Sequence, residues 1–253
     1  MVIIALVYFT FFVLGLVFGS FFNVVGLRVP IRKSIISPGS SCSNCGHKLS
    51  PIELIPVFSF LLQRGKCRSC GILISKQYVF IEILTGILFV LSIYEAGFHK
   101  DLMITISIIS LLIIIVVTDV NYMIIPNRIL LFFLFIFSIE RILIPLDPWW
   151  SSIVGAIGAF AVLLLINVIT RGGMGGGDIK LFSVLGIILG WELTFITFML
   201  ACFSGSIYGL VVILSGKLKR QNPIPFGPFI AIGGLVSSFY SENLLELYDI
   251  IFR

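Results

Sequence analysis

The sequence predicts an all-α polytopic membrane protein with about eight transmembrane helices and a cysteine-containing cytoplasmic loop after the first of them. Of its 253 residues, 58% are hydrophobic and only 11% are charged, which is far from the composition of a soluble domain of this length. The mean hydropathy is +1.15. The apolar residues also gather into long runs, as they do in membrane-spanning helices.

The first apolar run contains no charged residue. It lacks the basic start and the small-residue cleavage site of a secretory signal peptide, so we expect it to be retained as a membrane span. Several later runs are shorter than the ~20 residues that a full span needs. The two that begin at Ile179 and Phe226 are expected to be half-helices, tilted pieces or helices extended by their polar flanks. The eight runs cover residues 2–27, 79–97, 102–117, 129–144, 151–169, 179–189, 193–215 and 226–240.

Lys and Arg residues are divided unequally between the connections. If the N-terminus lies outside, 14 of the 17 fall on the cytoplasmic side, as expected because positively charged short loops stay in the cytoplasm. The net charge of +5 then requires no nucleic acid partner. Asp119 and Asp178 also lie on the cytoplasmic side in this topology. The 14 residues are Arg28, Arg32, Lys33, Lys48, Arg64, Lys66, Arg68, Lys76, Arg128, Arg171, Lys180, Lys217, Lys219 and Arg220.

The same pattern predicts three parts of the chain. Residues 1–27 form a first transmembrane helix, residues 28–78 a cytoplasmic loop, and residues 79–253 a membrane domain of several helices. We expect a multi-pass protein of a cytoplasmic membrane, in contact with lipid.

The cytoplasmic loop contains two CxxC pairs, Cys42 with Cys45 and Cys67 with Cys70, separated by 21 residues. This spacing is typical of a four-thiolate zinc ribbon, in which the metal is structural because no coordination position stays open. A glycine follows each pair and permits a tight turn. Two local redox pairs or a loop without metal are the alternatives, although disulfides seldom persist in a reducing cytoplasm.

Two aspartates are the candidate catalytic residues. Asp119 ends a long apolar run, and Asp178 follows six residues of which five are glycine. A carboxylate at the centre of a membrane helix costs about 2.5 to 3.5 kcal/mol on insertion scales, so such groups tend to be functional. A helix cap or an interfacial position is the simpler explanation for either residue. The glycine segment could pair with an extended substrate, whereas a phosphate loop is disfavoured because the Gly-Lys-Ser/Thr ending is missing.

Paired carboxylates can hydrolyse a peptide bond when they share one proton. The ionised group activates water while the neutral group donates to the carbonyl oxygen, and no covalent intermediate forms. Other hydrolytic sets are disfavoured, because the two histidines, His47 and His99, do not accompany a suitable serine nucleophile. His47 is interpreted as a loop residue, since four thiolates already complete the metal site.

Taken in order, the motifs of the chain resemble those of the bacterial type IV prepilin peptidases, which are membrane aspartic proteases of the GxGD type. The similarity extends over most of the sequence. The matching motifs are Gly19-Ser20-Phe21-Phe22-Asn23-Val24, Arg28-Val29-Pro30, the two CxxC pairs, Ile55-Pro56, Arg64-Gly65-Lys66-Cys67, Asp119 with Ile125-Pro126-Asn127, Gly175-Gly176-Gly177-Asp178 and Pro225-Phe226-Gly227-Pro228.

The resemblance implies an activity that composition alone does not. Such enzymes remove the basic leader of prepilins and pseudopilins at the cytoplasmic membrane face. Many then methylate the new N-terminal amine with S-adenosylmethionine. By the motif match, Asp119 and Asp178 would be catalytic and residues 79–253 would form the protease domain. The system served, whether pili, protein secretion or DNA uptake, is left open, and no residues are assigned to the methyl donor.

Two non-enzyme hypotheses are also kept. A proton- or cation-coupled transporter would use Asp119 and Asp178 as ion sites. The sequence of such a transporter is expected to have repeated halves, with acidic residues at the centres of its spans. Here both aspartates lie at the ends of apolar runs. A membrane scaffold with a zinc loop for docking would tolerate neutral replacements of both aspartates.

Overall fold

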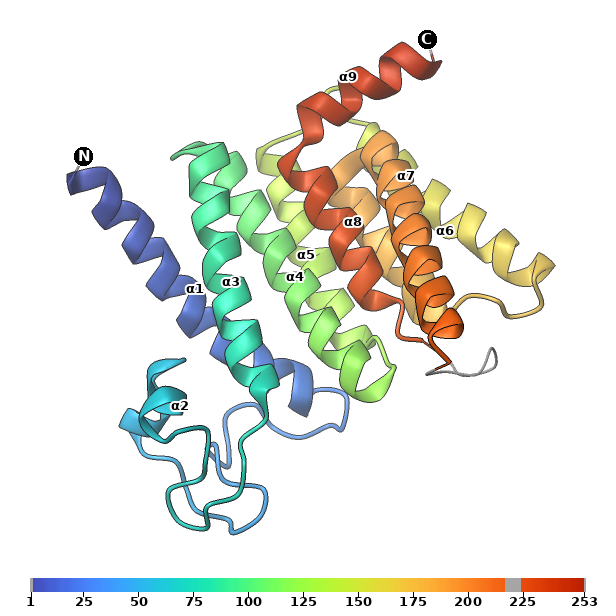
Figure 1. Ribbon diagram of the computed structural model, residues 1–253. Helices are drawn as coiled ribbons and strands as arrows, with labels where there is room; N and C mark the ends of the chain where they lie inside the picture. The colour runs from blue at the N-terminus through green and yellow to red at the C-terminus, as the bar shows by residue number, and fades with distance from the viewer. Residues whose placement is uncertain (1, 217–223, 253) are drawn as a thin grey trace. The chain divides into compact units, whose positions relative to one another are not determined.

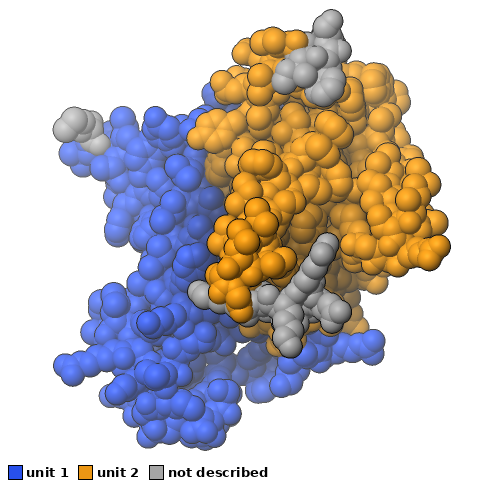
Figure 2. All heavy atoms as spheres, turned by 45° about the vertical axis from the view of Figure 1, so that its right-hand side comes forward, with its two compact units in different colours: residues 1–102 blue, residues 103–253 orange. Residues whose placement is uncertain are grey.

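The computed structural model describes residues 2–216 and 224–252, which form helices and the turns between them. The chain divides into two compact units, Met1–Leu102 and Met103–Arg253, coloured separately in Figure 2. Four of the basic residues considered for the topology, Lys217, Lys219, Arg220 and Arg253, lie outside the described residues.

The first unit contains two long helices, with the cysteine loop between them (Figure 1). Two short helical segments lie within the loop. The elements are α1 (Val2–Arg28), η1 (Pro51–Leu54), α2 (Phe58–Leu62) and α3 (Lys76–Ala96).

The second unit consists of helices only, as far as the structure describes it. They are α4 (Asp101–Tyr122), which begins just before the boundary between the units, α5 (Asn127–Leu143), α6 (Ser151–Ile169), α7 (Gly176–Leu214), α8 (Gly227–Phe239) and α9 (Ser241–Phe252).

Glycines let α1 and α3 pack at unusually short range. A Cβ atom on Gly15 would lie 2.7 Å from the Cα of Gly86, and one on Gly19 would lie 2.8 Å from the Cα of Glu82. The pairing shows that the two helices run antiparallel, with small residues four positions apart at the contact, as is common between membrane helices. One turn further on, the Asn23 side chain donates to the carbonyl of Tyr78 at 3.3 Å.

The cysteine loop is tied to α3 through Glu82. Its Oε2 atom accepts the backbone N–H of Val57 at 2.8 Å. Val57 has a φ of 60°, which is rare for a β-branched residue. Arg28 at the end of α1 donates to the carbonyls of Ser34 (3.0 Å) and Pro38 (2.8 Å). The first residues of the loop are therefore bound to the end of α1, and its interior is bound to α3.

The predicted all-α membrane class is confirmed, and each of the eight apolar runs is helical over almost its whole length. Five of the described helices, α1, α3, α4, α6 and α7, are long and apolar enough to cross a membrane, and α8 is a shorter apolar helix. The sequence did not predict α9, which follows the last apolar run and contains several acidic residues.

The longest helix, α7, is two segments joined by a sharp reversal. Gly190 has φ 79° and ψ 178°, outside the helical region, and glycine tolerates this conformation because it has no Cβ. The rings of Phe182 and Phe198, each eight positions from Gly190, meet with their centroids 5.6 Å apart. The runs 179–189 and 193–215 are therefore the two limbs of a helical hairpin, as the break between them indicated.

Polar groups from neighbouring helices hold this reversal. Ser151, at the start of α6, accepts the N–H of Trp191 at 3.2 Å. Arg141 of α5 donates to the carbonyl of Ile188, which ends the first limb. The backbone groups freed by the break are thereby partnered, as a membrane interior requires.

Helices α4 and α8 also pack antiparallel through glycines. A Cβ on Gly227 would lie 2.9 Å from Oδ2 of Asp119, and one on Gly234 would lie 3.0 Å from Cδ1 of Leu112. The glycines are seven positions apart, and so are their partners. The run from Leu111 to Ile115 on α4 is almost fully buried, which makes α4 the core helix of the second unit.

The contact between α6 and α7 predicts that alanine substitution lowers stability at one glycine of α6 and not at another. A Cβ at Gly155 would lie 2.5 Å from the carbonyl oxygen of Gly186, whereas a Cβ at Gly158 would meet nothing within 4 Å. Gly155→Ala should therefore lower stability by about 1 to 3 kcal/mol through overpacking, and Gly158→Ala should not. Thermal unfolding of the purified protein in detergent checks this. Equal melting temperatures for the two variants would contradict the helix packing described above.

Candidate active site and metal centre

Asp119 lies near the end of α4 and is buried, with 6% of its surface exposed. Its Oδ2 atom accepts the backbone N–H of Gly227 at 2.7 Å. Gly227 begins α8, and the first N–H groups of a helix have no partner within the helix. The contact requires glycine, because a side chain at this position would collide with the carboxyl group.

Asp178 lies in the first turn of α7. Gly175 immediately before this helix and Gly177 within its first turn leave room for close approaches: a Cβ on Gly175 would lie 2.7 Å from Oδ2 of Asp178, and one on Gly177 would lie 2.9 Å from Cβ of Ile125. The glycine segment thus permits the start of α7 to lie against the turn between α4 and α5.

The two aspartates are 59 positions apart in sequence, yet the approach of Gly177 to Ile125 brings Asp178 to the turn that follows Asp119. Among the described residues, neither carboxylate forms an ion pair with Lys, Arg or His. Two partly buried like charges without a counter-cation are most stable when they hold one proton between them. The arrangement is therefore suited to general acid and general base chemistry.

A side-chain hydrogen bond also joins the start of α7 to the start of α5. Lys180, one half-turn beyond Asp178, donates to Oδ1 of Asn127 at 3.1 Å. Asn127 begins α5 and follows Ile125 and Pro126. The motifs around Asp119, Asp178 and Gly227 therefore meet at one end of the second unit, although they are well separated along the chain.

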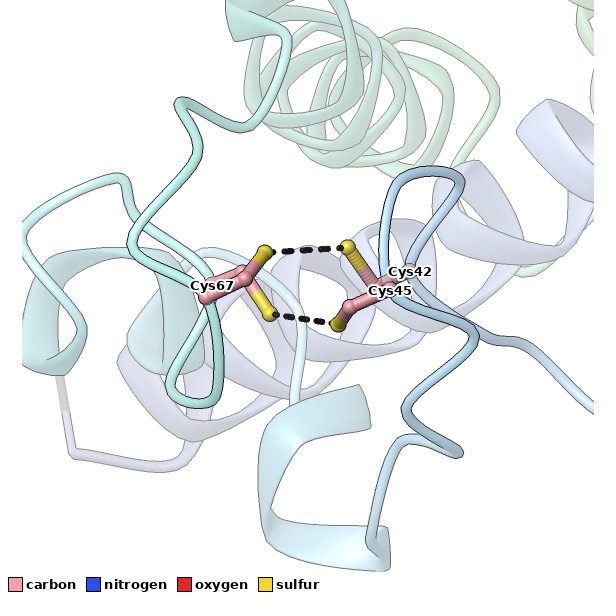
Figure 3. A group of neighbouring side chains, drawn as sticks. Cys42, Cys45 and Cys67 are labelled. Carbon is pink, nitrogen blue, oxygen red and sulfur yellow. Dashed lines mark hydrogen bonds between the residues drawn. The ribbon is translucent and has the colours of Figure 1, made fainter.

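The four loop cysteines also meet. Their sulfur atoms all lie within 4.8 Å of one another, with Cys42 and Cys70 at 3.8 Å and Cys45 and Cys67 at 3.9 Å. Figure 3 shows the sulfurs facing one another across the gap between the two loop segments. Tetrahedral zinc with Zn–S bonds of about 2.3 Å requires sulfurs about 3.8 Å apart. The donor set and its spacing fit this ion.

The two CxxC segments have the same backbone geometry. The backbone N–H of Cys42 donates to the carbonyl of His47 at 2.9 Å, and the backbone N–H of Cys67 donates to the carbonyl of Ile72 at 2.8 Å. The glycines after the pairs, Gly46 and Gly71, have φ values of 69° and 72°. The expectation that these glycines permit tight turns is confirmed.

Backbone donors favour the thiolate form of two of these cysteines. The N–H of Cys45, followed by that of Asn44, lowers the pKa of Cys42. The N–H of Ile72, followed by the Asn44 side chain, lowers the pKa of Cys70 to about 6. Thiolate is the form that binds metal.

His47 is directed to a different partner. Its Nε2 atom lies 3.3 Å from Oε2 of Glu53, and the metal-ligand cluster consists of the four cysteines alone. The backbone N–H of Ser50, then its hydroxyl and then His47 hold the pKa of Glu53 below its usual range. His47 is a loop residue, as the sequence suggested.

Sequence reasoning missed two contacts made by backbone groups. The prolines of the Pro225-Phe226-Gly227-Pro228 motif predict a helix break before the last span, either in a substrate groove or in a plain loop, but not that the N–H of Gly227 binds Asp119. The N–H of Val57 binds Glu82 in the same way. A Pro-Xaa-Gly-Pro sequence before an apolar run does indicate a helix start, but it does not identify the side chain that the helix start will meet.

These features define a membrane protein in which the segments bearing two aspartates meet at one end of the second unit, and in which four cysteines cluster in the loop of the first unit. Residues 13–96 match the bacterial peptidase A24 N-terminal domain, and residues 106–210 match the type IV leader peptidase family. The chain belongs to the type IV leader peptidase family. The unmatched stretch between the two regions includes the boundary between the two structural units.

Curated relatives agree with this family along almost the whole chain. A prepilin leader peptidase/N-methyltransferase of Bacillus subtilis is 44% identical over 237 residues, which cover 94% of this chain and 96% of the relative. Proteins of the same name from Stutzerimonas stutzeri and Pseudomonas aeruginosa are 31% and 28% identical, and each match covers 93% of this chain and 91% of the relative. No solved structure matches the chain. The transporter hypothesis gains no support from these matches.

Proposed function

We propose that this protein cleaves the basic leader from type IV prepilins or pseudopilins, using water activated by Asp119 and Asp178. The observation that carries the proposal is that the segments bearing Asp119 and Asp178 meet at one end of the second unit, with no ion pair to either carboxylate among the described residues, in a chain of the leader peptidase family. Hydrolysis by such a pair requires no group other than water and the two carboxyls.

The reaction proceeds by general acid and base catalysis. The ionised carboxylate takes a proton from water as its oxygen attacks the scissile carbonyl carbon, and the protonated carboxyl donates to the carbonyl oxygen. On collapse of the tetrahedral intermediate the C–N bond breaks. The carboxyl that took the proton from water donates it to the departing amine, and the other carboxylate takes back its proton from the hydroxyl of the intermediate as the carbonyl reforms. Leader and mature pilin are released, and neither aspartate becomes covalently attached.

We infer that both aspartates and the cysteine loop lie at the cytoplasmic face of a bacterial inner membrane. The uneven distribution of Lys and Arg supports this orientation. A prepilin can then keep its hydrophobic helix in the bilayer while its polar leader reaches the aspartates. The partners are such substrates and membrane lipid, and the basic residues require no nucleic acid.

The four cysteines are proposed to hold one structural zinc ion. All four ligand positions would be filled by thiolates, so the ion would stabilise the loop and would not activate water. The fixed attachment of this loop to α1 and α3 supports a role in shaping the first unit.

Methylation of the new N-terminus is proposed as a second activity, because the relatives are named as N-methyltransferases. S-adenosylmethionine would supply the methyl group. A cavity of about 320 Å³ in the cysteine loop is lined by Glu53, Gln63, Lys66 and Arg68. Oε1 of Glu53 is buried without a hydrogen-bond partner. These residues fit the aminoacyl end of the methyl donor, since Glu53 can accept from an ammonium and the two cations can hold a carboxylate.

Replacing either aspartate should abolish leader cleavage. Asp119→Asn and Asp178→Asn keep the shape of the side chain but remove the acid and base chemistry, so we expect no processing of a co-expressed prepilin while the amount of protein in the membrane stays normal. Asp101→Asn, at the opposite end of α4 from Asp119, is the matched control and should process normally. Full processing by either active-site variant would refute the dyad.

Removing one thiolate should release the metal. Cys42→Ser is expected to reduce bound zinc from one ion per chain to a small fraction, as measured by elemental analysis of the purified protein, and to increase proteolysis between residues 28 and 78. Cys202→Ser, which removes the cysteine outside the cluster, should retain full zinc. Unchanged zinc in the Cys42 variant would exclude the four-thiolate site.

Arg68→Ala should weaken binding of S-adenosylmethionine about tenfold, because one charged hydrogen bond contributes about 1.5 kcal/mol or more. Equilibrium dialysis with the labelled compound measures this in the full-length protein. Arg64→Ala removes a nearby arginine that does not line the cavity and serves as the control. Equal affinities in the two variants, with zinc retained, would exclude the cavity as the methyl-donor site.

A further inference from the structure

The two aspartates have different surroundings, although their side chains are chemically the same. Asp119 accepts the N–H of Gly227 at 2.7 Å in a buried hydrogen bond, and the N–H of Phe226 also acts on the same carboxyl group. Both donors come from the start of α8, a helix of 13 residues. The carboxyl group thus occupies the position of an anion at a helix N-terminus, where free N–H groups and the helix dipole stabilise negative charge.

The close contact is built into the sequence at Gly227. A Cβ on this residue would lie 2.9 Å from Oδ2, 3.0 Å from Cβ and 3.2 Å from Cγ of Asp119. Pro228 follows at the first helical turn, where the missing N–H of proline costs nothing and its fixed φ favours the helix start. These residues keep the helix N-terminus directed at Asp119.

Asp178 receives less stabilisation of its charge. Its backbone donor is Gly175, and Asp119 is a like-charged neighbour that opposes a second negative charge. The other charged groups on the packed helices do not neutralise either acid. Lys180 is bound to Asn127, Arg128 on α5 is exposed, and α8 contains no charged residue.

We propose that the N-terminus of α8 fixes Asp119 as the ionised general base and leaves the shared proton on Asp178, the general acid, with Gly227 as the positioning residue. This inference rests on the proposed leader peptidase function and assigns one role to each aspartate. Asp119 takes the proton from the attacking water, while Asp178 donates its proton to the scissile carbonyl oxygen.

The test is the pH dependence of leader cleavage by Gly227→Ala. The added methyl group must push the Asp119 carboxyl away from the N–H donor, so the base takes up a proton at higher pH. We expect the acidic limb of the kcat profile to move upward by about one pH unit, the equivalent of one hydrogen bond to a charged group, with KM little changed.

Gly234→Ala is the matched control. It adds the same methyl group on the same helix against the same neighbour, α4, but it meets the side chain of Leu112 at 3.0 Å and no carboxyl group. Its acidic limb should coincide with that of the unaltered protein. A shift of equal size in both variants would show that helix packing is responsible and would overturn the assignment.

A second variant removes the donor without adding bulk. Replacing the amide between Phe226 and Gly227 by an ester deletes the N–H that binds Asp119 and adds no methyl group, although it also weakens the Phe226 carbonyl as an acceptor. It should move the acidic limb in the same direction even if Gly227→Ala does not fold. Movement of the alkaline limb of the kcat profile would make Asp119 the acid. If neither limb moved, α8 would have no role in setting the charge of Asp119. Either result overturns the inference.

An unaltered protein that fails to cleave leaders would instead refute the proposed function.

Discussion

Two carboxyl groups can be held side by side near a membrane only if the surrounding chain compensates for their mutual repulsion and loss of water. In this protein the compensation comes from backbone groups and not from cations. Asp119 is bound by the helix start at Gly227, and the glycines around Asp178 permit a close approach to Ile125. The antiparallel packing of α4 with α8 serves this one requirement. In the proposed mechanism, sharing of one proton by the pair would complete the compensation.

The first unit is organised by a different constraint. A loop of almost fifty residues between α1 and α3 has little apolar core of its own, and small modules of this kind usually depend on a metal. Four sulfurs with tetrahedral spacing meet that need. The Glu82 contact to Val57 and the Arg28 contacts to Ser34 and Pro38 then join the loop to the membrane helices. The cysteine cluster and the contacts to α1 and α3 therefore constrain the same short segment.

Patterns of side chains predicted much of this arrangement. The apolar runs located the helices, the break between residues 189 and 193 indicated the reversal at Gly190, and the CxxC spacing identified the cluster. Contacts made by backbone N–H groups could not be predicted, because any residue except proline supplies the same donor. The approach of Gly227 to Asp119 depends on how α8 packs against α4, a relation that no local pattern of residues contains. For the same reason α9, with its mixed polar sequence, was missed.

In the proposed mechanism Asp119 and Asp178 share one proton at neutral pH. Infrared difference spectroscopy of the purified protein with labelled aspartate measures protonated carboxyl groups directly. We expect one protonated aspartate band in the unaltered protein that disappears in both Asp119→Asn and Asp178→Asn, because each replacement removes either the group that holds the proton or the charge that keeps it there. A band that is absent from the unaltered protein, or retained in both variants, would show that the pair does not share a proton.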